Sequence, residues 1–329
     1  MARESARAYR QFCPKCLDFH AHFLQREVFE SAHRHSVSSC FGANLISPEL
    51  PVMRRMFEPE LQIADMEVTA VDLHILSSAD VIQSRNWATP PQEARMCALV
   101  NDECASWIER YPDRFIGTAV VPFGDMGSAI GELERSVKLG LRILNLPSNY
   151  RGSYLGEARY HEFWSAVREN DVVAFIHPHG VEDRWFQAYA LWNSIGQSIE
   201  EVKVMSSLIY EGVMDRNPGL KIVMAHGGGY MPHYMGRLDR NVTDKPHTVK
   251  NIRKKPSEYL ADFYYDSCVY DARTLEILIE RVGIDRVVLG GDYPVGAFDP
   301  LEFLQQVRIS DEGRARIAGG NAMRLLGLA

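Results

Sequence analysis

The stretch "CLDFHAHFL", residues 16–24, is a short apolar run that carries two histidines one residue apart. Side chains on a strand alternate between its two faces, so His20 and His22 are expected to point in the same direction. Two imidazoles on a buried strand lose their hydration, and this loss is costly unless a partner binds their lone pairs. A divalent metal ion is one such partner. A pair of hydrogen-bonded core histidines is the alternative that this stretch leaves open.

Runs of this kind recur along the chain and predict the fold. Apolar, β-branched segments of strand length alternate with longer segments of helical periodicity, which indicates a parallel sheet with helices on its faces. The predicted strands are residues 16–23, 68–76, 114–123, 141–147, 172–178, 221–227, 263–269 and 286–294. The predicted helices include residues 92–110, 125–138, 157–169, 200–216, 272–282 and 300–308. Eight strands with helices between them predict an α/β fold, a closed (β/α)8 TIM barrel.

The length leaves room for insertions around such a barrel. A barrel of this kind takes about 250 residues, so roughly 80 of the 329 residues remain for insertions. The longest gaps follow strands one, five and six, and the first gap covers about residues 24–62. No linker or internal repeat divides the chain, so we expect residues 1–329 to form one domain.

The composition excludes several classes of protein. Hydrophobic residues make up 46% and charged residues 24% of the chain, which is typical of a globular protein and not of a disordered one. The net charge of −7 and the lack of a long basic block argue against nucleic acid as a partner. No run reaches the ~18 apolar residues of a membrane span, and the first residues lack the apolar stretch of a secretory signal. We therefore expect a cytoplasmic protein that binds neither nucleic acid nor membranes.

Polar residues also stand at the carboxyl ends of other predicted strands. They are His177 in strand five, His226 in strand six and Asp292 in strand eight. In TIM barrels this end of the strands carries the active site. Imidazoles together with a carboxylate suit zinc, manganese or iron, and a coordination position left open for water is typical of a catalytic site.

Five motifs make the chain similar to a known family. They are "DFHAHF" (18–23), "FIHPHG" (175–180), "MAHGGGYMPHYMGRLDR" (224–240), "YYDSCVYD" (264–271) and "LGGDYPVG" (289–296). With these motifs in this order, nearly the whole chain resembles the amidohydrolase superfamily (amidohydrolase family 2). Within it, the chain looks like the aminocarboxymuconate-semialdehyde decarboxylase branch.

The resemblance implies a metal centre and a reaction. It implies one metal ion, usually zinc (Zn2+) with Mn2+, Fe2+ or Co2+ as alternatives, bound by four residues. These ligands are His20, His22, His177 and Asp292. His226 is implied as the catalytic acid or base, and Asp292 counts as catalytic because it completes the metal shell. The implied reaction is nonoxidative decarboxylation of a small unsaturated or aromatic acid, of the aminocarboxymuconate-semialdehyde or hydroxybenzoate type.

The resemblance also suggests residues that bind the substrate. Arg237 matches an arginine that in the family reaches the neighbouring subunit's active site and holds a carboxylate, which implies a homodimer. An exposed helix arginine is the alternative for Arg237. His179 stands where the decarboxylase that names the branch has a tryptophan; it could bind a substrate hydroxyl or lie at the pocket rim.

One departure from the family pattern affects the substrate. Leu50 falls near the position of a second substrate-binding arginine, just upstream of "FEP" at 57–59. Arg54 or Arg55 could take its place, although either could equally lie on a solvated helix face. The namesake substrate of the branch is therefore not implied for this chain.

Other polar residues have simple structural explanations, and the sequence also suggests alternative functions. We expect the polar residues Asp18, His74 and Asp266 to be hydrogen-bonded structural groups and not metal ligands.

"HGGG" at 226–229 also resembles the oxyanion loop of lipases, but the chain has no GxSxG sequence to supply the nucleophile. A metal-dependent hydrolase or hydratase of the same superfamily stays open, because the same ligands serve those reactions. A noncatalytic metal-binding barrel is a further alternative, in which His226 would have no role.

Overall fold

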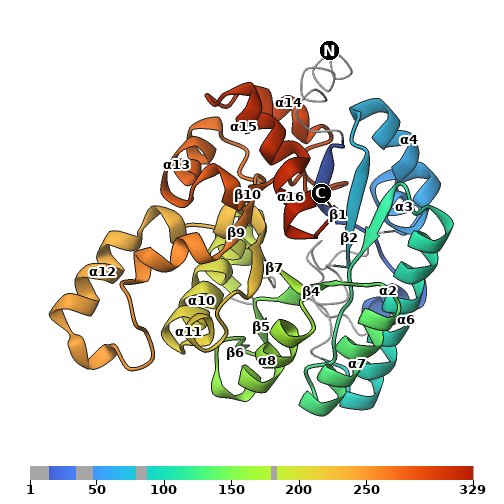
Figure 1. The fold of residues 1–329 in the computed structure, drawn as a ribbon. Coiled ribbons are helices and arrows are strands. Elements are labelled where there is room, and N and C mark those ends of the chain that lie inside the picture. The colour runs from blue at the N-terminus through green and yellow to red at the C-terminus, as the bar shows by residue number, and fades with distance from the viewer. Residues whose placement is uncertain (1–14, 35–46, 79–86, 179–183, 329) are drawn as a thin grey trace.

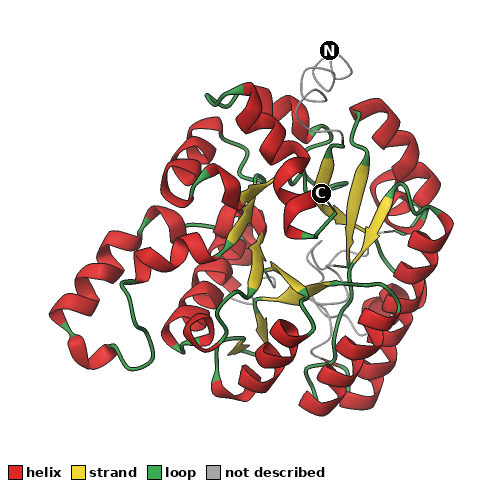
Figure 2. Cartoon of the chain, viewed as in Figure 1, coloured by secondary structure: helices red, strands yellow, loops and turns green. Residues whose placement is uncertain are grey.

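The computed structural model describes residues 15–34, 47–78, 87–178 and 184–328. Parallel strands form the centre of the molecule, and helices surround them (Figures 1 and 2). One sheet has the order β1-β2-β3, and the other has the order β10-β9-β8-β7-β4. Their bounds are β1 (Leu17–His22), β2 (Leu73–Ser77), β3 (Phe115–Gly117), β4 (Ile143–Pro147), β7 (Val173–His177), β8 (Lys221–Met224), β9 (Tyr264–Asp266) and β10 (Val287–Val288).

Two parallel bridges join these sheets into a closed barrel. Ala119, just after β3, pairs with Leu144 of β4, and its amide donates to the Ile143 carbonyl at 2.7 Å. Ala21 of β1 pairs with Tyr293 beyond β10, where the His22 amide donates to the Tyr293 carbonyl at 2.7 Å. The eight predicted strands are thus joined in chain order, and the predicted TIM barrel is confirmed.

The helices lie outside the barrel, and several begin at side-chain caps. The long ones follow the strands, and α6 begins with a capping box formed by Thr89 and Gln92, ahead of Pro90. Asp125 and Asp271 cap α7 and α13 with their side chains. The α-helices are α2 (Arg26–Arg34), α3 (Pro51–Phe57), α4 (Pro59–Thr69), α6 (Pro90–Arg110), α7 (Met126–Lys138), α8 (His161–Glu169), α9 (Arg184–Gln187), α10 (Gln197–Tyr210), α11 (Val213–Arg216), α12 (Met235–Asp244), α13 (Ala272–Val282), α14 (Pro300–Gln305), α15 (Asp311–Ala315) and α16 (Asn321–Leu325).

The predicted insertions carry short elements of their own. The segment after β1 holds α2, α3 and α4; the segment after β7 holds α9 and the short helices η3 (Ala188–Ala190) and η4 (Trp192–Gly196). The segment after β8 is built from α12 and short helices, and α12 projects from the side of the barrel (Figure 1). These short helices are η5 (Ala225–Gly228), η6 (Met231–His233), η7 (Pro246–Thr248) and η8 (Pro256–Asp262). A hairpin of β5 (Asn149–Tyr150) and β6 (Ser153–Tyr154), with η2 (Ala158–Tyr160), follows β4 and was not predicted; η9 (Ile284–Arg286) and η10 (Arg316–Gly320) complete the chain.

Several predicted boundaries were wrong. The second strand begins at Leu73 and not at residue 68, because α4 continues to Thr69 and ends at Ala70 in a left-handed conformation. The sixth strand stops at Met224, since His226 and the following glycines have positive φ angles, which strands exclude. The predicted helix 200–216 is divided into α10 and α11 at Gly212, which has φ +74°.

The barrel interior holds its own apolar layer. Leu17 and Phe19 of β1 pack there with Ile143, Phe175 and other residues of the facing strands, and α16 contributes Ala322 and Leu325 to this cluster. The register of β1 against β2 shifts between Asp18 and Ala21. Such a bulge re-aims side chains, and it lets the apolar Phe19 and the two histidines after it share the barrel interior. None of the helices in the described parts of the chain is long and apolar enough to cross a membrane.

An ion pair on the outside of the barrel gives a pH-dependent contribution to stability. Hydrogen bonds from the Arg308 side chain, with further ones from the Arg308 amide and Arg273, lower the pKa of Glu276 on α13 from 4.5 to about 2. A lowered pKa adds stability above pH 4.5, and this contribution is lost as the pH falls toward 2. We therefore expect Glu276→Gln to lower the melting temperature near about pH 7 and to change it much less near about pH 3. Thermal unfolding at both pH values measures this; Glu302→Gln, at an exposed glutamate of α14, is the control, and an equal loss at both pH values would contradict the assignment.

Candidate metal and active site

Five side chains predicted from the sequence meet at the carboxyl ends of the barrel strands. His20 and His22 end β1, His177 ends β7, and His226 and Asp292 follow β8 and β10. One potential ligand atom each from His20, His177, His226 and Asp292 lies within 4.8 Å of the others. His22 joins this group through Asp292, because its Nε2 lies 2.7 Å from the Asp292 Oδ1. The shared direction predicted for His20 and His22 is therefore confirmed.

The group has the chemistry of a divalent metal site. The exposed fractions of His20, His22 and His177 are 0%, 4% and 4%, so water does not satisfy their ring nitrogens. The Nε2 atoms of His20 and His22 both face Asp292, at 3.2 and 2.7 Å from its Oδ1, and the buried His20 Nε2 makes no hydrogen bond with the described residues. Neighbouring ring centroids lie only 5.0–5.4 Å apart. Buried lone pairs that converge beside a carboxylate fit a mononuclear metal ion of the zinc type.

The electrostatics of the group favour one bound positive charge. Burial alone would raise the pKa of Asp292, but His20 and His22 hold it well below its usual range. Burial likewise disfavours a charge on His20, yet Asp292 and Asp266 raise its pKa to about 10. Burial and the neighbouring imidazoles keep the pKa of His177 well below its usual value. The carboxylates thus stabilise a positive charge on His20, which a bound metal ion would supply instead, while His177 keeps its lone pairs.

Two aspartates behind the group hold it in place. The Asp266 Oδ2 accepts from the His20 Nδ1 at 2.7 Å, and its Oδ1 accepts from the amides of Gly227 and Cys268, each at 3.1 Å. Asp18 accepts from the amides of His20 at 2.9 Å and Gly291 at 3.0 Å, which joins strand one to the segment before Asp292. Their predicted roles as hydrogen-bonded groups are confirmed. Because Asp266 binds Nδ1 of His20, it directs Nε2 toward the site.

His74 stands apart from this group, as predicted. Its Nδ1 lies 3.1 Å from the Gln62 Oε1, and burial lowers its pKa to about 3. The Gln62 amide also donates to the His22 carbonyl at 2.8 Å, which fastens the end of β1 to α4. His74 is therefore a neutral structural histidine one layer behind the site.

His226 has a carboxylate partner that the sequence analysis missed. Glu201 of α10 is fully buried, and its Oε1 lies 2.7 Å from the His226 Nδ1. Burial raises the pKa of this glutamate to about 7, although His226 opposes the shift. The only sequence signal was an acidic residue among apolar ones near the start of a predicted helix, which does not identify a partner. His226 and Asp292 also have φ angles of 48° and 57°, a conformation that residues other than glycine adopt rarely and often at functional sites.

A cavity of about 470 Å³ opens beside His226 and Asp292. Its walls come from the insertions after β7 and β8 and from the loop after β9. They include Asn193, Gln197, Ser198, Tyr230, His233, Tyr270 and Thr274. Hydroxyl, amide and imidazole groups around a cavity of this size suit a small polar molecule with few rings.

Of the predicted substrate-binding residues, those that the structure describes do not line this cavity. Arg237 lies on α12 with an exposed side chain, away from the cavity walls, and makes no hydrogen bond or ion pair with the described residues. His179 lies outside the described residues. Arg54 forms a bidentate pair with Glu58 at 2.7 and 2.8 Å, and Arg55 binds Asp65 at 2.6 Å. Both arginines considered as substitutes near the exposed Leu50 are thus engaged within the chain.

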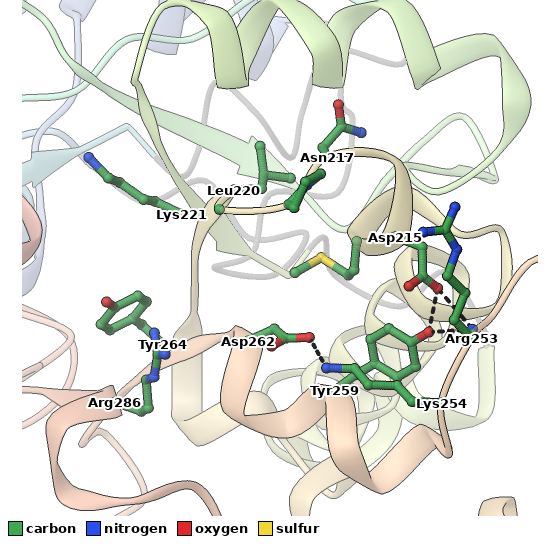
Figure 3. A pocket seen from close by; sticks show the side chains of 13 residues that line it. Asp215, Asn217, Leu220, Lys221, Arg253, Lys254, Tyr259, Asp262, Tyr264 and Arg286 are labelled. Atoms are coloured by element: carbon green, nitrogen blue, oxygen red, sulfur yellow. Dashed lines mark hydrogen bonds and ion pairs between the residues drawn. The ribbon is translucent and has the colours of Figure 1, made fainter.

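A second cavity, of about 640 Å³, lies at the opposite end of the strands (Figure 3). Lys221 and Tyr264 in its wall are the first residues of β8 and β9. Its charges are largely satisfied within the protein: Lys254 binds Asp262 at 2.5 Å and Lys221 binds Asp171 at 2.7 Å. In Figure 3, Tyr259 and Arg253 meet at Asp215, but no histidine is among the described residues that line this cavity, so it lacks the constellation found at the other end.

Comparisons with known proteins agree with this arrangement. Residues 17–328 match the family described as Amidohydrolase. The 2-amino-3-carboxymuconate-6-semialdehyde decarboxylase of Dictyostelium discoideum is 30% identical over 279 residues, which cover 83% of this chain and 77% of the relative. Gamma-resorcylate decarboxylase of Polaromonas sp. (strain JS666) is 29% identical over 295 residues, with coverages of 82% and 88%.

Among solved structures, the crystal structure of 5-carboxyvanillate decarboxylase from Sphingomonas paucimobilis has a TM-score of 0.87 and 26% identity. The match covers 96% of this chain and 99% of that one, so the similarity extends over the barrel and its insertions alike. The chain therefore belongs to the amidohydrolase family, in the branch of 2-amino-3-carboxymuconate-6-semialdehyde decarboxylase.

Proposed function

We propose that the protein is a metal-dependent nonoxidative decarboxylase of a small unsaturated or aromatic carboxylic acid. The observation that carries this proposal is the meeting of four imidazoles and Asp292 at the carboxyl ends of the barrel strands, beside a cavity of about 470 Å³. The relatives reported above support it, since each is named as a decarboxylase of a carboxylic acid. We also propose that residues 1–329 work as one barrel domain in the cytoplasm.

The proposed metal ligands are His20, His22, His177 and Asp292. The Nε2 atoms of His20 and His22, which lie 3.2 and 2.7 Å from the Asp292 Oδ1, and the lowered pKa of Asp292 support this set, since a metal ligand must be deprotonated. We propose Zn2+, which these ligands bind well, with Mn2+, Fe2+ or Co2+ as alternatives. When bound, the ion supplies a positive charge that orients a substrate oxygen and stabilises negative charge as it develops.

His226 is proposed to move the proton. Its Nδ1 is held by Glu201, which leaves Nε2 as the nitrogen available to the substrate. The protonated ring donates this proton to the carbon that bears the carboxylate. A π electron pair of the substrate forms this new C–H bond. The bond to the carboxylate then breaks, its electron pair restores the π system of the substrate, and carbon dioxide leaves. Burial would lower the pKa of His226, but the negative charges of Glu201 and Asp292 raise it and so favour the protonated donor form.

Two further residues are proposed to bind the substrate. His179 follows β7 and would bind a substrate hydroxyl, and Arg237 would bind a carboxylate as a guanidinium fork. Arg237 lies on α12, which projects from the side of the barrel, and its guanidinium has no partner among the described residues (Figure 1). An exposed, unpaired arginine on a projecting helix supports contribution across a homodimer interface.

The proposed reaction is tested by carbon dioxide release from hydroxybenzoates, aminobenzoates and carboxymuconate-type acids. We expect release with about one equivalent of metal per chain, measured by elemental analysis, and loss of release after chelation. His226→Asn should keep the metal and lose about 10²-fold or more in kcat, because asparagine tolerates the left-handed backbone there but moves no proton. Metal without carbon dioxide release would point to hydration or hydrolysis. Absence of metal would overturn the ligand assignment.

The role of Asp266 is tested through metal affinity. Asp266→Asn weakens the acceptor that directs the His20 ring, so we expect a loss of about 10- to 100-fold in zinc affinity, measured by competition with a chromophoric chelator. Asp271→Asn in the same loop is the matched control, because asparagine still caps α13 and Asp271 does not contact the site. Equal affinities for Asp266→Asn and the wild-type protein would show that His20 needs no such support.

The role of Arg237 across an interface is tested by subunit complementation. Arg237→Ala and His226→Asn should each abolish most activity. In a mixed dimer the site with an intact His226 receives an intact Arg237 from its neighbour, so an equal mixture should regain about a quarter of the wild-type activity. Mixing after mild dissociation, with each variant alone as control, measures this. If the mixture stays as inactive as its components, Arg237 does not act across an interface.

A further inference from the structure

The glycine-rich segment after β8 brings α10 unusually close to His226. Residues 227–229 are three glycines, with φ angles of +63°, +74° and +60°. A Cβ atom on Gly229 would lie 2.5 Å from the Glu201 Oε2 and 2.6 Å from the Ser198 carbonyl oxygen. Any side chain at residue 229 would therefore push the helix, and its glutamate, away from His226. The "HGGG" motif, which has no lipase-like role here, makes room for this approach.

Among the described residues, the Glu201 carboxylate makes a hydrogen bond only with His226. This carboxylate is fully buried, one oxygen binds the His226 Nδ1 at 2.7 Å, and the other has no partner among the described residues. A buried carboxylate with one hydrogen bond is costly for the fold. The adjacent Glu200 differs, because its carboxylate binds Ser148 and Asn149 at 3.0 and 2.8 Å and Lys203 at 2.8 Å. The carboxylate of Glu200 thus has several hydrogen-bond partners in the surrounding structure, whereas that of Glu201 binds only His226 among the described residues.

We propose that Glu201 is a positioning residue that keeps a proton on Nδ1 of His226 and thereby presents Nε2 to the substrate. This inference rests on the proposed role of His226 in proton transfer. The carboxylate accepts the Nδ1–H hydrogen bond in both states of the ring, while Nε2 alone gains and loses the proton. The negative charge of Glu201 also stabilises the doubly protonated ring that precedes donation. No proton passes to Glu201 itself.

Three variants separate the parts of this role. Glu201→Gln keeps a hydrogen-bond acceptor and removes the charge, so kcat should fall about 10- to 100-fold. Glu201→Leu removes both the acceptor and the charge, so kcat should fall about 10³-fold. KM should stay within about threefold in each, because Glu201 does not touch the substrate. Glu200→Gln, one residue along the same helix and also buried, is the matched control and should keep kcat within about threefold.

A spectroscopic measurement gives a second readout that does not depend on turnover. Long-range 1H–15N spectra of protein labelled with 15N-histidine, with zinc added, report which ring nitrogen carries the proton. The His226 signals are identified by their absence from His226→Asn. We expect the neutral ring to carry its proton on Nδ1 in the wild-type protein, in Glu200→Gln and in Glu201→Gln, and on Nε2 in Glu201→Leu. Metal content and thermal unfolding, measured alongside, separate this effect from loss of the fold.

The outcomes distinguish this inference from the proposed function. If no acid tested releases carbon dioxide but the spectra change as expected, the decarboxylase proposal fails and the positioning of His226 stands. If Glu201→Leu keeps the proton on Nδ1, or keeps kcat within about threefold of the wild type, Glu201 does not position His226 and the inference is wrong. If Glu201→Leu does not fold, Glu201→Gln decides through kcat, and wild-type kcat in that variant overturns the inference.

Discussion

The structure depends on satisfying a buried group of imidazoles at the mouth of the barrel. Imidazoles that converge without water are unfavourable unless each has a partner on both sides of its ring. Here the carboxylates of Asp266 and Glu201 bind one ring nitrogen of His20 and His226, each at 2.7 Å, and the other nitrogen faces the centre of the group. Asp292 lies within 2.7 Å of His22 on the inner side. Asp266 and Glu201 orient the rings from outside the group. The proposed metal ion would bind the inward-facing nitrogens of the ligand histidines.

The backbone around the group departs from regular strand geometry, and this departure brings the imidazoles and Asp292 together. β1 shifts register between Asp18 and Ala21, which places the imidazoles beside the apolar layer of the barrel. β8 ends at Met224, and both His226 and Asp292 have left-handed backbone conformations. Such conformations cost about 1–3 kcal/mol each and persist only where the surroundings fix them. The hydrogen bonds of Asp18 and Asp266 to neighbouring amides provide that fixation, so the same aspartates support both the rings and the turns.

The chemistry and the choice of substrate come from different parts of the chain. The proposed metal-site residues belong to the barrel strands or to their first turns, whereas the cavity wall comes from the insertions after β7 and β8 and the loop after β9. Loops can change without disturbing the barrel, which is why one barrel supports several reactions in a family. The polar wall formed by Asn193, Gln197 and Thr274 is therefore the part of this protein to compare with the 5-carboxyvanillate and gamma-resorcylate decarboxylases.

The sequence by itself determined the eight strands, their order and the residues that form the centre. Period-two runs and the polar residues at their ends identified His20, His22, His177, His226 and Asp292, because local alternation is a property of neighbouring residues. It could not determine where regular strand gives way to left-handed turns at His226 and Asp292, since that depends on contacts with other strands.

Only the tertiary structure paired His226 with Glu201 and His20 with Asp266, residues 25 and 246 positions apart. It also separated Arg54 and Arg55, which bind acidic neighbours, from Arg237, which binds nothing among the described residues. A single sequence records which groups are present. Which of them meet is decided by the closure of the barrel, which brings the carboxyl ends of distant strands to one place.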